Sequence, residues 1–181
     1  MFNSNEKFIS VDIETSGPIP NEYSMLSIGA CLVEDQSKTF YIELIPTSSK
    51  FIPDAMKVNK LSLDDLHLTG VKPNEAMIQF EDWVKSLCKD GEKPIFVGFN
   101  AAFDWSFINY YFHKYIDRNP FGVAPLDIKS MFLGAYKGSW RDTRYSEIKN
   151  KLKPTKSNNH NALIDAQAQA EIFSIIANKN V

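Results

Sequence analysis

The order of its predicted elements constrains the fold of this chain most, because strands come first and helices then alternate with a further strand. Apolar and polar residues alternate with a period of two over residues 8–14, and two more strands are predicted over 27–33 and 39–45. Helical spacing and turn signals then predict a helix over 73–87, a strand over 94–99, and helices over 101–116, 126–136 and 160–178, with Asp127 as the cap of the helix over 126–136. This order predicts an α/β fold with helices flanking a mixed sheet.

Two acidic residues share one face of the first predicted strand. Ile9, Val11 and Ile13 point to one side of this strand, so Asp12 and Glu14 point to the other, at the end of the strand. Two residues along a strand span about 6.5 Å. Side chains at this spacing could bracket one or two divalent ions. An acidic pair at a strand end is also common in turns, and the pair alone leaves both interpretations open.

Composition limits the class of protein. The chain has 181 residues, 44% of them hydrophobic and 23% charged, which fits one folded domain over residues 1–181 rather than a disordered chain. No apolar run approaches the roughly 18 residues of a membrane span, and the polar start lacks a signal peptide, so a cytoplasmic protein without a membrane partner is expected. Two cysteines are too few for a disulfide framework, and both Cys31 and Cys88 are predicted to be buried thiols.

The charge is unevenly distributed. The whole chain carries a formal charge of −2, yet residues 137–156 hold seven Lys and Arg residues against two acidic residues, a net charge of +5. A cationic segment on an acidic protein can bind phosphates through counterion release. The same segment could equally be a solvated loop and helix face.

Two further sequence features place candidate functional residues near the starts of predicted helices. Asp104 falls in the first turn of the helix over 101–116, directly after the strand over 94–99, where α/β folds bind ligands, although the helix dipole alone also favours an acid there. His160 and Asp165 are five residues apart, or about 140° around a helix. We therefore expect His160 on the preceding loop, near a substrate or as a capping residue, and Asp165 facing the sheet.

Together these features resemble the DEDDh 3'-5' exonuclease superfamily, the DnaQ-like proteins that include proofreading exonucleases, ribonuclease T and oligoribonuclease. The three motifs read FISVDIETSG at 8–17, GFNAAFD at 98–104 and HNALIDA at 160–166. The sister DEDDy branch has a tyrosine four residues before the last aspartate. This chain has Asn161 there and His160 one place earlier, which favours the histidine branch.

The resemblance implies a ribonuclease H-like exonuclease fold with a mixed five-stranded sheet. It implies that two Mg²⁺ or Mn²⁺ ions are held by four acidic residues, namely Asp12, Glu14, Asp104 and Asp165. By the same resemblance His160 takes a proton from the attacking water, because imidazole is neutral and basic near pH 7. The implied product is a nucleoside 5'-monophosphate released from the 3' end of single-stranded DNA or RNA.

The resemblance also implies a pocket for the 3' end, lined by Thr15, Ser16, Gly17 and Phe103. Phe103 could instead be plain core, and the Thr15 hydroxyl could instead bond backbone. Two other functions fit the same fold: an inactive nucleic-acid-binding or polymerase-accessory module, and an oligoribonuclease-like enzyme for very short RNA. The expected partner is a single-stranded 3' end, while a polymerase partner and a homodimer are both compatible with the family.

Overall fold

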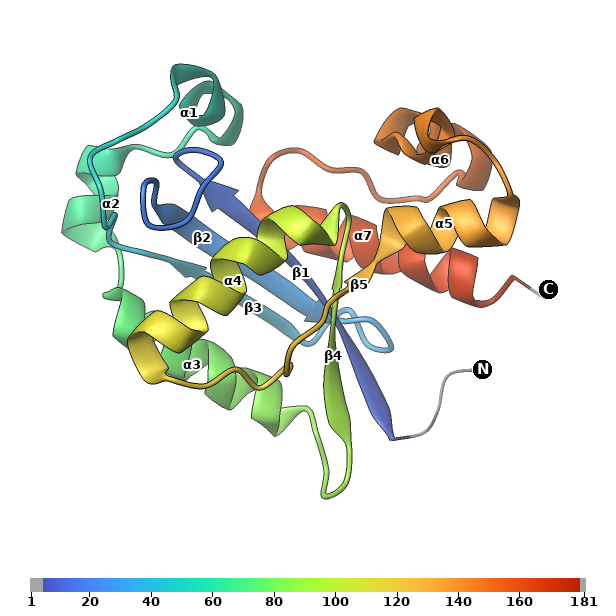
Figure 1. The fold of residues 1–181 in the computed structure, drawn as a ribbon, viewed down its shortest axis with the longest axis horizontal. Coiled ribbons are helices and arrows are strands. Elements are labelled where there is room, and N and C mark those ends of the chain that lie inside the picture. Colours follow the sequence, from blue (N-terminus) through green and yellow to red (C-terminus); the bar gives the residue numbers. More distant parts are fainter. Residues whose placement is uncertain (1–4, 180–181) are drawn as a thin grey trace.

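The computed structural model describes residues 5–179 and contains a mixed five-stranded sheet, as predicted (Figure 1). The strand order across the sheet is β3-β2-β1-β4-β5. β1 pairs antiparallel with β2 and parallel with β4, so the first strand lies in the middle of the sheet. The strands are β1 (Glu6–Thr15), β2 (Met25–Leu32), β3 (Thr39–Glu43), β4 (Lys93–Gly98) and β5 (Leu126–Asp127).

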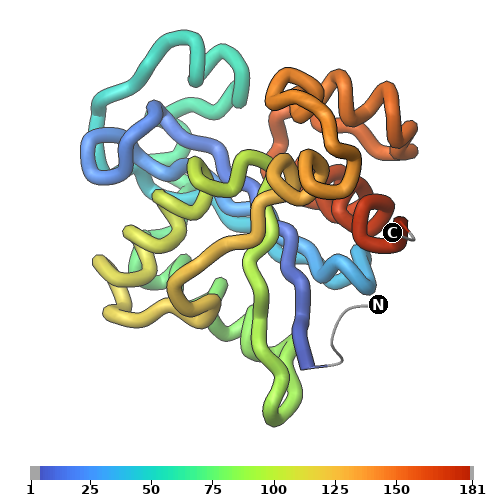
Figure 2. Tube along the Cα trace, turned by 45° about the vertical axis from the view of Figure 1, so that its right-hand side comes forward, coloured from blue at the N-terminus to red at the C-terminus, as the bar shows by residue number. Residues whose placement is uncertain are grey.

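Alternation along β1 divides the core into two layers. Ile9, Val11 and Ile13 pack with residues of α3 and α4, whereas Phe8 on the opposite face packs with residues of α5 and α7. Asp12 belongs to the same face as Phe8 and therefore faces the α7 side of the sheet. Figures 1 and 2 both show α5 and α6 stacked beside α7 at one side of the sheet.

Short capping signals fix where several helices begin. Pro occupies the first turn of α1 and α3, and the Asp127 and Asn161 side chains accept backbone N–H groups at the starts of α5 and α7. The helices are α1 (Pro53–Asn59), α2 (Leu63–Thr69), α3 (Pro73–Ser86), α4 (Ala101–Ile116), α5 (Ile128–Tyr136), the 3₁₀ helix η1 (Trp140–Thr143), α6 (Tyr145–Leu152) and α7 (Ala162–Ala177).

Two expectations from the sequence are wrong in detail. Leu126 does not begin a helix but forms the edge strand β5 with Asp127, because these residues pair with Val97 and Gly98 of β4 before α5 starts, while Asp127 caps α5 as expected. Cys31 is buried as expected, but Cys88 is only half-buried, since it lies in the turn that follows α3. Among residues 5–179, no helix combines the length and the apolar character needed to cross a bilayer.

Candidate active site

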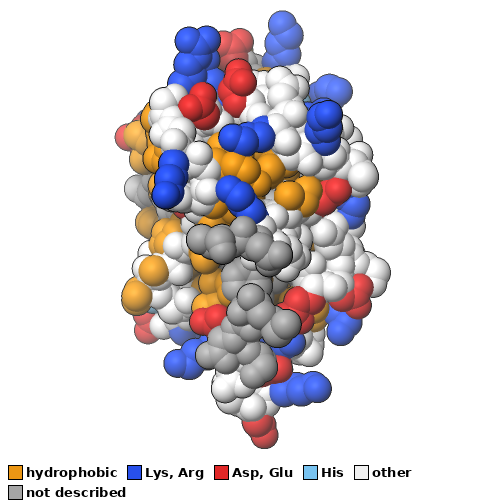
Figure 3. All heavy atoms as spheres, turned by 90° about the vertical axis from the view of Figure 1, so that its right-hand side faces the viewer, with side chains coloured by type: hydrophobic (Ala, Val, Ile, Leu, Met, Phe, Trp, Pro, Cys, Tyr) orange, Lys and Arg blue, Asp and Glu red, His pale blue; other side chains and the backbone are white. Residues whose placement is uncertain are grey.

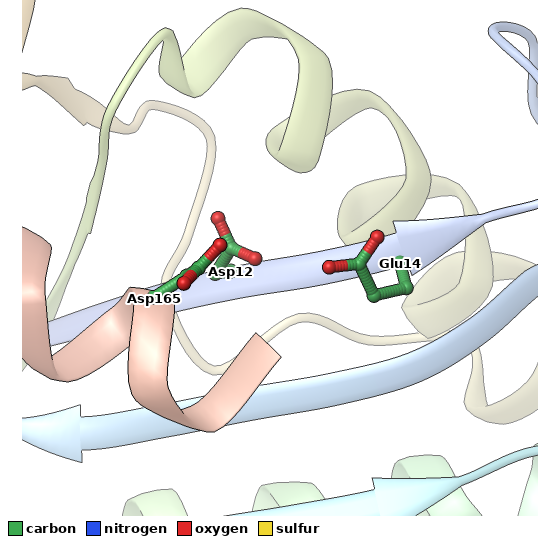
Figure 4. A group of neighbouring side chains, drawn as sticks. All are labelled: Asp12, Glu14 and Asp165. Atoms are coloured by element: carbon green, nitrogen blue, oxygen red, sulfur yellow. The ribbon is translucent and has the colours of Figure 1, made fainter. Parts of the chain in front are cut away.

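Three carboxylates from two distant segments meet on the α7 side of the sheet. Asp12 and Glu14 project from β1, and Asp165 reaches the same place from the first turns of α7 (Figure 4). One carboxylate oxygen from each of these residues lies within 4.8 Å of the others. Oxygen ligands at this spacing suit a hard divalent cation such as Mg²⁺ or Mn²⁺.

Gly29 allows α7 to approach this closely. It pairs with Asp12 in the ladder between β1 and β2, directly beside the acidic cluster. A Cβ atom at Gly29 would lie 2.1 Å from the backbone carbon of Ala162 and 2.2 Å from the amide nitrogen of Leu163. Only a residue without a side chain fits under the first turn of α7, so Gly29 sets the distance between Asp165 and Asp12.

Asp104 completes the acidic group from the opposite layer. The ladder between β1 and β4 ends at Ser10 and Val97, so no strand within residues 5–179 pairs with this edge of β1 beyond that point. The chain turns through Asn100, whose backbone is left-handed with φ 64°, and enters α4. The Asp104 carboxylate then accepts the free amide N–H of Ile13 at 3.2 Å. The end of a parallel strand therefore delivers the fourth carboxylate to the cluster.

Burial and mutual repulsion raise the pKa of these carboxyls. Burial holds the pKa of Asp12 well above its usual range, and the charges of Asp104, Asp165 and Glu14 add to this effect. Burial, followed by the charge of Asp165, raises the pKa of Glu14 to about 7. Burial likewise raises the pKa of Asp104 to about 8, against the lowering effect of its backbone hydrogen bonds. Such a cluster is poorly stabilised by the protein alone, and a bound divalent cation would remove the repulsion.

The loop before α7 holds His160 at the rim of the cluster. The backbone N–H groups of Asn159 and His160 donate to the two oxygens of Asp165, at 2.7 and 3.2 Å. These bonds partly offset the raised pKa that burial gives Asp165. His160 has a left-handed backbone with φ 64° and an exposed side chain. The imidazole can therefore contact a ligand, while the backbone N–H of His160 holds the Asp165 carboxylate.

A cavity of about 340 Å³ opens over the carboxylates. Its lining brings together all five residues that the sequence predicts as catalytic, namely Asp12, Glu14, Asp104, His160 and Asp165. Three polar residues outside the motifs also line it, namely Tyr145, Asn158 and Gln169. The Tyr145 hydroxyl accepts the backbone N–H of Asn158 at 3.1 Å, which ties α6 to the loop that carries His160.

Gln169 is the most informative residue that the motifs miss. Its side-chain amide donates to Oδ1 of Asp12 at 2.5 Å, and its carbonyl oxygen accepts the backbone N–H of Phe99 at 2.9 Å. Gln169 therefore orients the Asp12 carboxylate on β1 and also holds the turn that follows β4. The sequence holds one signal for it, because Gln169 lies four residues after Asp165 and so on the same face of α7.

The predicted substrate-binding residues occupy different environments. Phe103 lines the acidic cavity, and with Thr15 it also lines a neighbouring cavity of about 360 Å³ between the end of β1 and α1. The Thr15 hydroxyl donates to the carbonyl of Gly17 at 2.9 Å. Ser16 is fully buried and donates to the carbonyl of Lys50, while Gly17 packs tightly against the ring of Tyr23. A substrate-binding role for these four residues stays a prediction.

Comparison with known proteins identifies the relatives of this chain. The family model described as a 3'-5' exoribonuclease Rv2179c-like domain matches residues 7–177. The 3'-5' DNA exonuclease Cap18 of Escherichia coli is 56% identical over 176 residues, covering 97% of this chain and 94% of Cap18. Ribonuclease T of Histophilus somni (strain 129Pt) is 25% identical over 182 residues, covering 94% of this chain and 83% of that protein.

Solved structures show the same fold at low sequence identity. The nuclease domain of 3'hExo, a DEDDh family member bound to rAMP, superposes with a TM-score of 0.79 at 14% identity, covering 99% of this chain and 96% of that one. Escherichia coli exonuclease I in complex with a dT13 oligonucleotide gives a TM-score of 0.72 at 13% identity, covering 96% of this chain and 41% of that one. With the match over residues 7–177, these findings show that the chain is a 3'-5' exonuclease of the Rv2179c-like family, built on the DEDDh exonuclease fold.

Proposed function

We propose that the chain hydrolyses the 3'-terminal phosphodiester bond of single-stranded nucleic acid and releases nucleoside 5'-monophosphates. The single observation that carries this proposal is the convergence of four carboxylates and His160 around one open cavity. A family relationship implies divalent-metal dependence, and the raised pKa values of Asp12, Glu14 and Asp104 fit a site that needs positive charge. We assign it two Mg²⁺ or Mn²⁺ ions.

Each residue of the site has a distinct task in this proposal. The ions are held by Asp12, Glu14, Asp104 and Asp165. When bound, they supply positive charge that offsets the charge developing on the phosphate, and they favour ionisation of water. His160 accepts the proton of the attacking water from the rim of the cavity. Gln169 keeps the Asp12 carboxylate in one orientation through its hydrogen bond.

The shape of the site supports attack at an end. We place the terminal nucleotide in the cavity over the carboxylates and its base in the neighbouring cavity beside Thr15 and Phe103. Phe103 contributes to both cavities, so its ring lies where a terminal base or sugar would pass between them. Binding by stacking and backbone contacts needs an end but no particular sequence.

DNA is the first substrate to test and RNA the second. The 56% identical relative is named a 3'-5' DNA exonuclease, whereas the description of the matching family model names an exoribonuclease. A single exonuclease domain over residues 1–181, a cytoplasmic location, and a homodimer or polymerase partner stay predictions from the sequence.

A cleavage assay with matched substrates tests the proposal. The substrates are 5'-labelled single-stranded DNA, single-stranded RNA of the same sequence, a dinucleotide and a blunt duplex, each with Mg²⁺, Mn²⁺ or EDTA. We expect a ladder of products shortened from the 3' end, with metal only. A gel shift without cleavage would instead identify a binding module, and cleavage of the dinucleotide alone would identify an oligoribonuclease-like enzyme.

A further inference from the structure

Trp140 presents an indole ring to solvent from a rigid backbone. The residue is 60% exposed, which is unusual for so large an apolar side chain. It opens η1, where the Asp142 carboxylate accepts both the backbone N–H and the hydroxyl of Ser139, at 2.7 and 2.9 Å. The fully buried Thr143 donates its hydroxyl to the carbonyl of Trp140 at 2.7 Å. These bonds hold the backbone of η1, and the Trp140 side chain lies largely at the surface.

A chain of contacts connects this ring to the active-site cavity. The Lys129 ammonium lies 4.4 Å from the centre of the Trp140 ring. The same ammonium donates to the side-chain oxygen of Asn100 at 3.5 Å. Asn100 lines the acidic cavity, and so does Tyr145, five residues after Trp140 in the chain. Trp140 thus stands just outside the cavity, one side chain beyond its rim.

The surroundings of Trp140 are cationic. Arg141 and Arg144 are exposed, and neither makes an ion pair with another residue in the range 5–179. The hydrogen bonds from Ser139, followed by the charges of Lys151 and Arg141, lower the pKa of the Asp142 carboxyl. Lys and Arg side chains also dominate the upper part of the face drawn in Figure 3, over the region of α5 and α6. An exposed ring with Lys129 against it, in a region rich in Lys and Arg (Figure 3), suits a ligand that is both aromatic and anionic.

We propose that Trp140 is a stacking platform for an unpaired base upstream of the two 3'-terminal nucleotides, with Lys129, Arg141 and Arg144 beside the adjoining phosphates. This inference rests on the proposed function. Every base has an aromatic face, so the platform binds single strands without sequence preference, and a paired base cannot use it. Cations beside the ring add cation–π and phosphate contacts.

Substrate length tests the platform in cleavage. For Trp140→Ala we expect KM on a 12-nucleotide single strand to rise roughly ten-fold with little change in kcat, and this effect to vanish on a dinucleotide, which has no base upstream of its two nucleotides. Trp140→Phe, which keeps a flat ring, should recover most of the loss. Leu68→Ala is the matched control, because Leu68 is 86% exposed on α2, at the other side of the molecule. An unchanged KM on the long strand, or an equal loss on both lengths, overturns the proposal.

Fluorescence provides a second measurement that does not require cleavage. The chain has three tryptophans, so in EDTA we expect a single-stranded oligonucleotide to quench the emission of the wild type and to quench Trp140→Phe much less. Equal quenching in both proteins overturns the platform. A wild type that is quenched but never cleaves refutes the proposed function alone, so the two failures are distinguishable.

Discussion

At the scale of single residues, the motifs predicted the acids and the histidine but not the contacts that orient them. One cavity is lined by all five predicted catalytic residues, although they come from three motifs far apart in the sequence. They are Asp12, Glu14, Asp104, His160 and Asp165. The motifs did not predict Gln169, because its partner Asp12 lies 157 positions away and no local sequence pattern encodes such a contact. Its place four residues after Asp165 becomes meaningful only once α7 is known to lie on β1.

Replacing Gln169 should weaken metal binding. Gln169→Leu removes the hydrogen bond to Asp12 and leaves the backbone N–H of Phe99 without its acceptor. We expect about ten-fold more Mg²⁺ to be needed for half-maximal activity, as is typical when a residue that orients a metal ligand is lost. Gln167→Leu is a matched control on the same helix, because Gln167 bonds the carbonyl of Gln36 instead. Equal metal dependence in both variants would contradict an orienting role for Gln169.

Removing the imidazole should separate turnover from metal binding. His160→Ala keeps the backbone N–H that donates to Asp165, so the carboxylates should retain their positions. We expect kcat to fall roughly 100- to 10,000-fold, the usual range for loss of a general base. The rise in melting temperature on adding Mg²⁺ should stay close to that of the wild type. Full turnover in purified His160→Ala would refute the assignment of the base.

At the scale of elements, periodicity predicted the long segments and failed at the short ones. α4 has the expected bounds because apolar and aromatic side chains run along its whole length. The sequence does not predict β5, because a two-residue strand has no periodicity of its own and only its pairing with β4 defines it. η1 and α6 lie within the cationic segment. So many residues are charged there that the buried residues Thr143 and Ile148 form no apolar pattern.

The contact between β2 and α7 gives a sharp test at this scale. Gly29→Ala places a methyl group against the backbone of Ala162, which must move away from β2. We expect a loss of about 1–3 kcal/mol in the free energy of unfolding, as for other overpacked sites, together with loss of cleavage as Asp165 shifts.

Gly134→Ala is the control for this substitution. Gly134 lies within α5, and apart from its chain neighbours and the nearby backbone of α5, a Cβ atom there meets no heavy atom of the described residues within 4 Å. Alanine should therefore stabilise the protein by about 0.5–1 kcal/mol and leave cleavage unchanged. Chemical denaturation and the 3'-end cleavage assay measure both variants. Equal stability of the two alanine variants would mean that α7 tolerates a side chain beneath it.

At the scale of the whole molecule, the ionised carboxylates of the site should lower the free energy of unfolding when no divalent cation is bound. The pKa of Glu14 rises from 4.5 to about 7, and that of Asp104 rises from 3.8 to about 8. Between the ordinary and the raised values, the folded protein binds more protons than the unfolded chain. Stability without metal should therefore fall as pH increases through this range. A divalent ion binds the deprotonated carboxylates, so its stabilising effect should grow over the same interval.

Melting curves at pH 5, 6.5 and 8 test this linkage. In EDTA we expect the melting temperature of the wild type to decrease from pH 5 to pH 8, and in Mg²⁺ we expect most of that decrease to disappear. Asp104→Asn should flatten the decrease in EDTA, because its amide can still accept the N–H of Ile13 but cannot ionise. The same variant should lose both the Mg²⁺ effect and cleavage. A melting temperature in EDTA that rises over this range, equally in wild type and Asp104→Asn, would mean that the carboxylates do not repel one another in the folded protein.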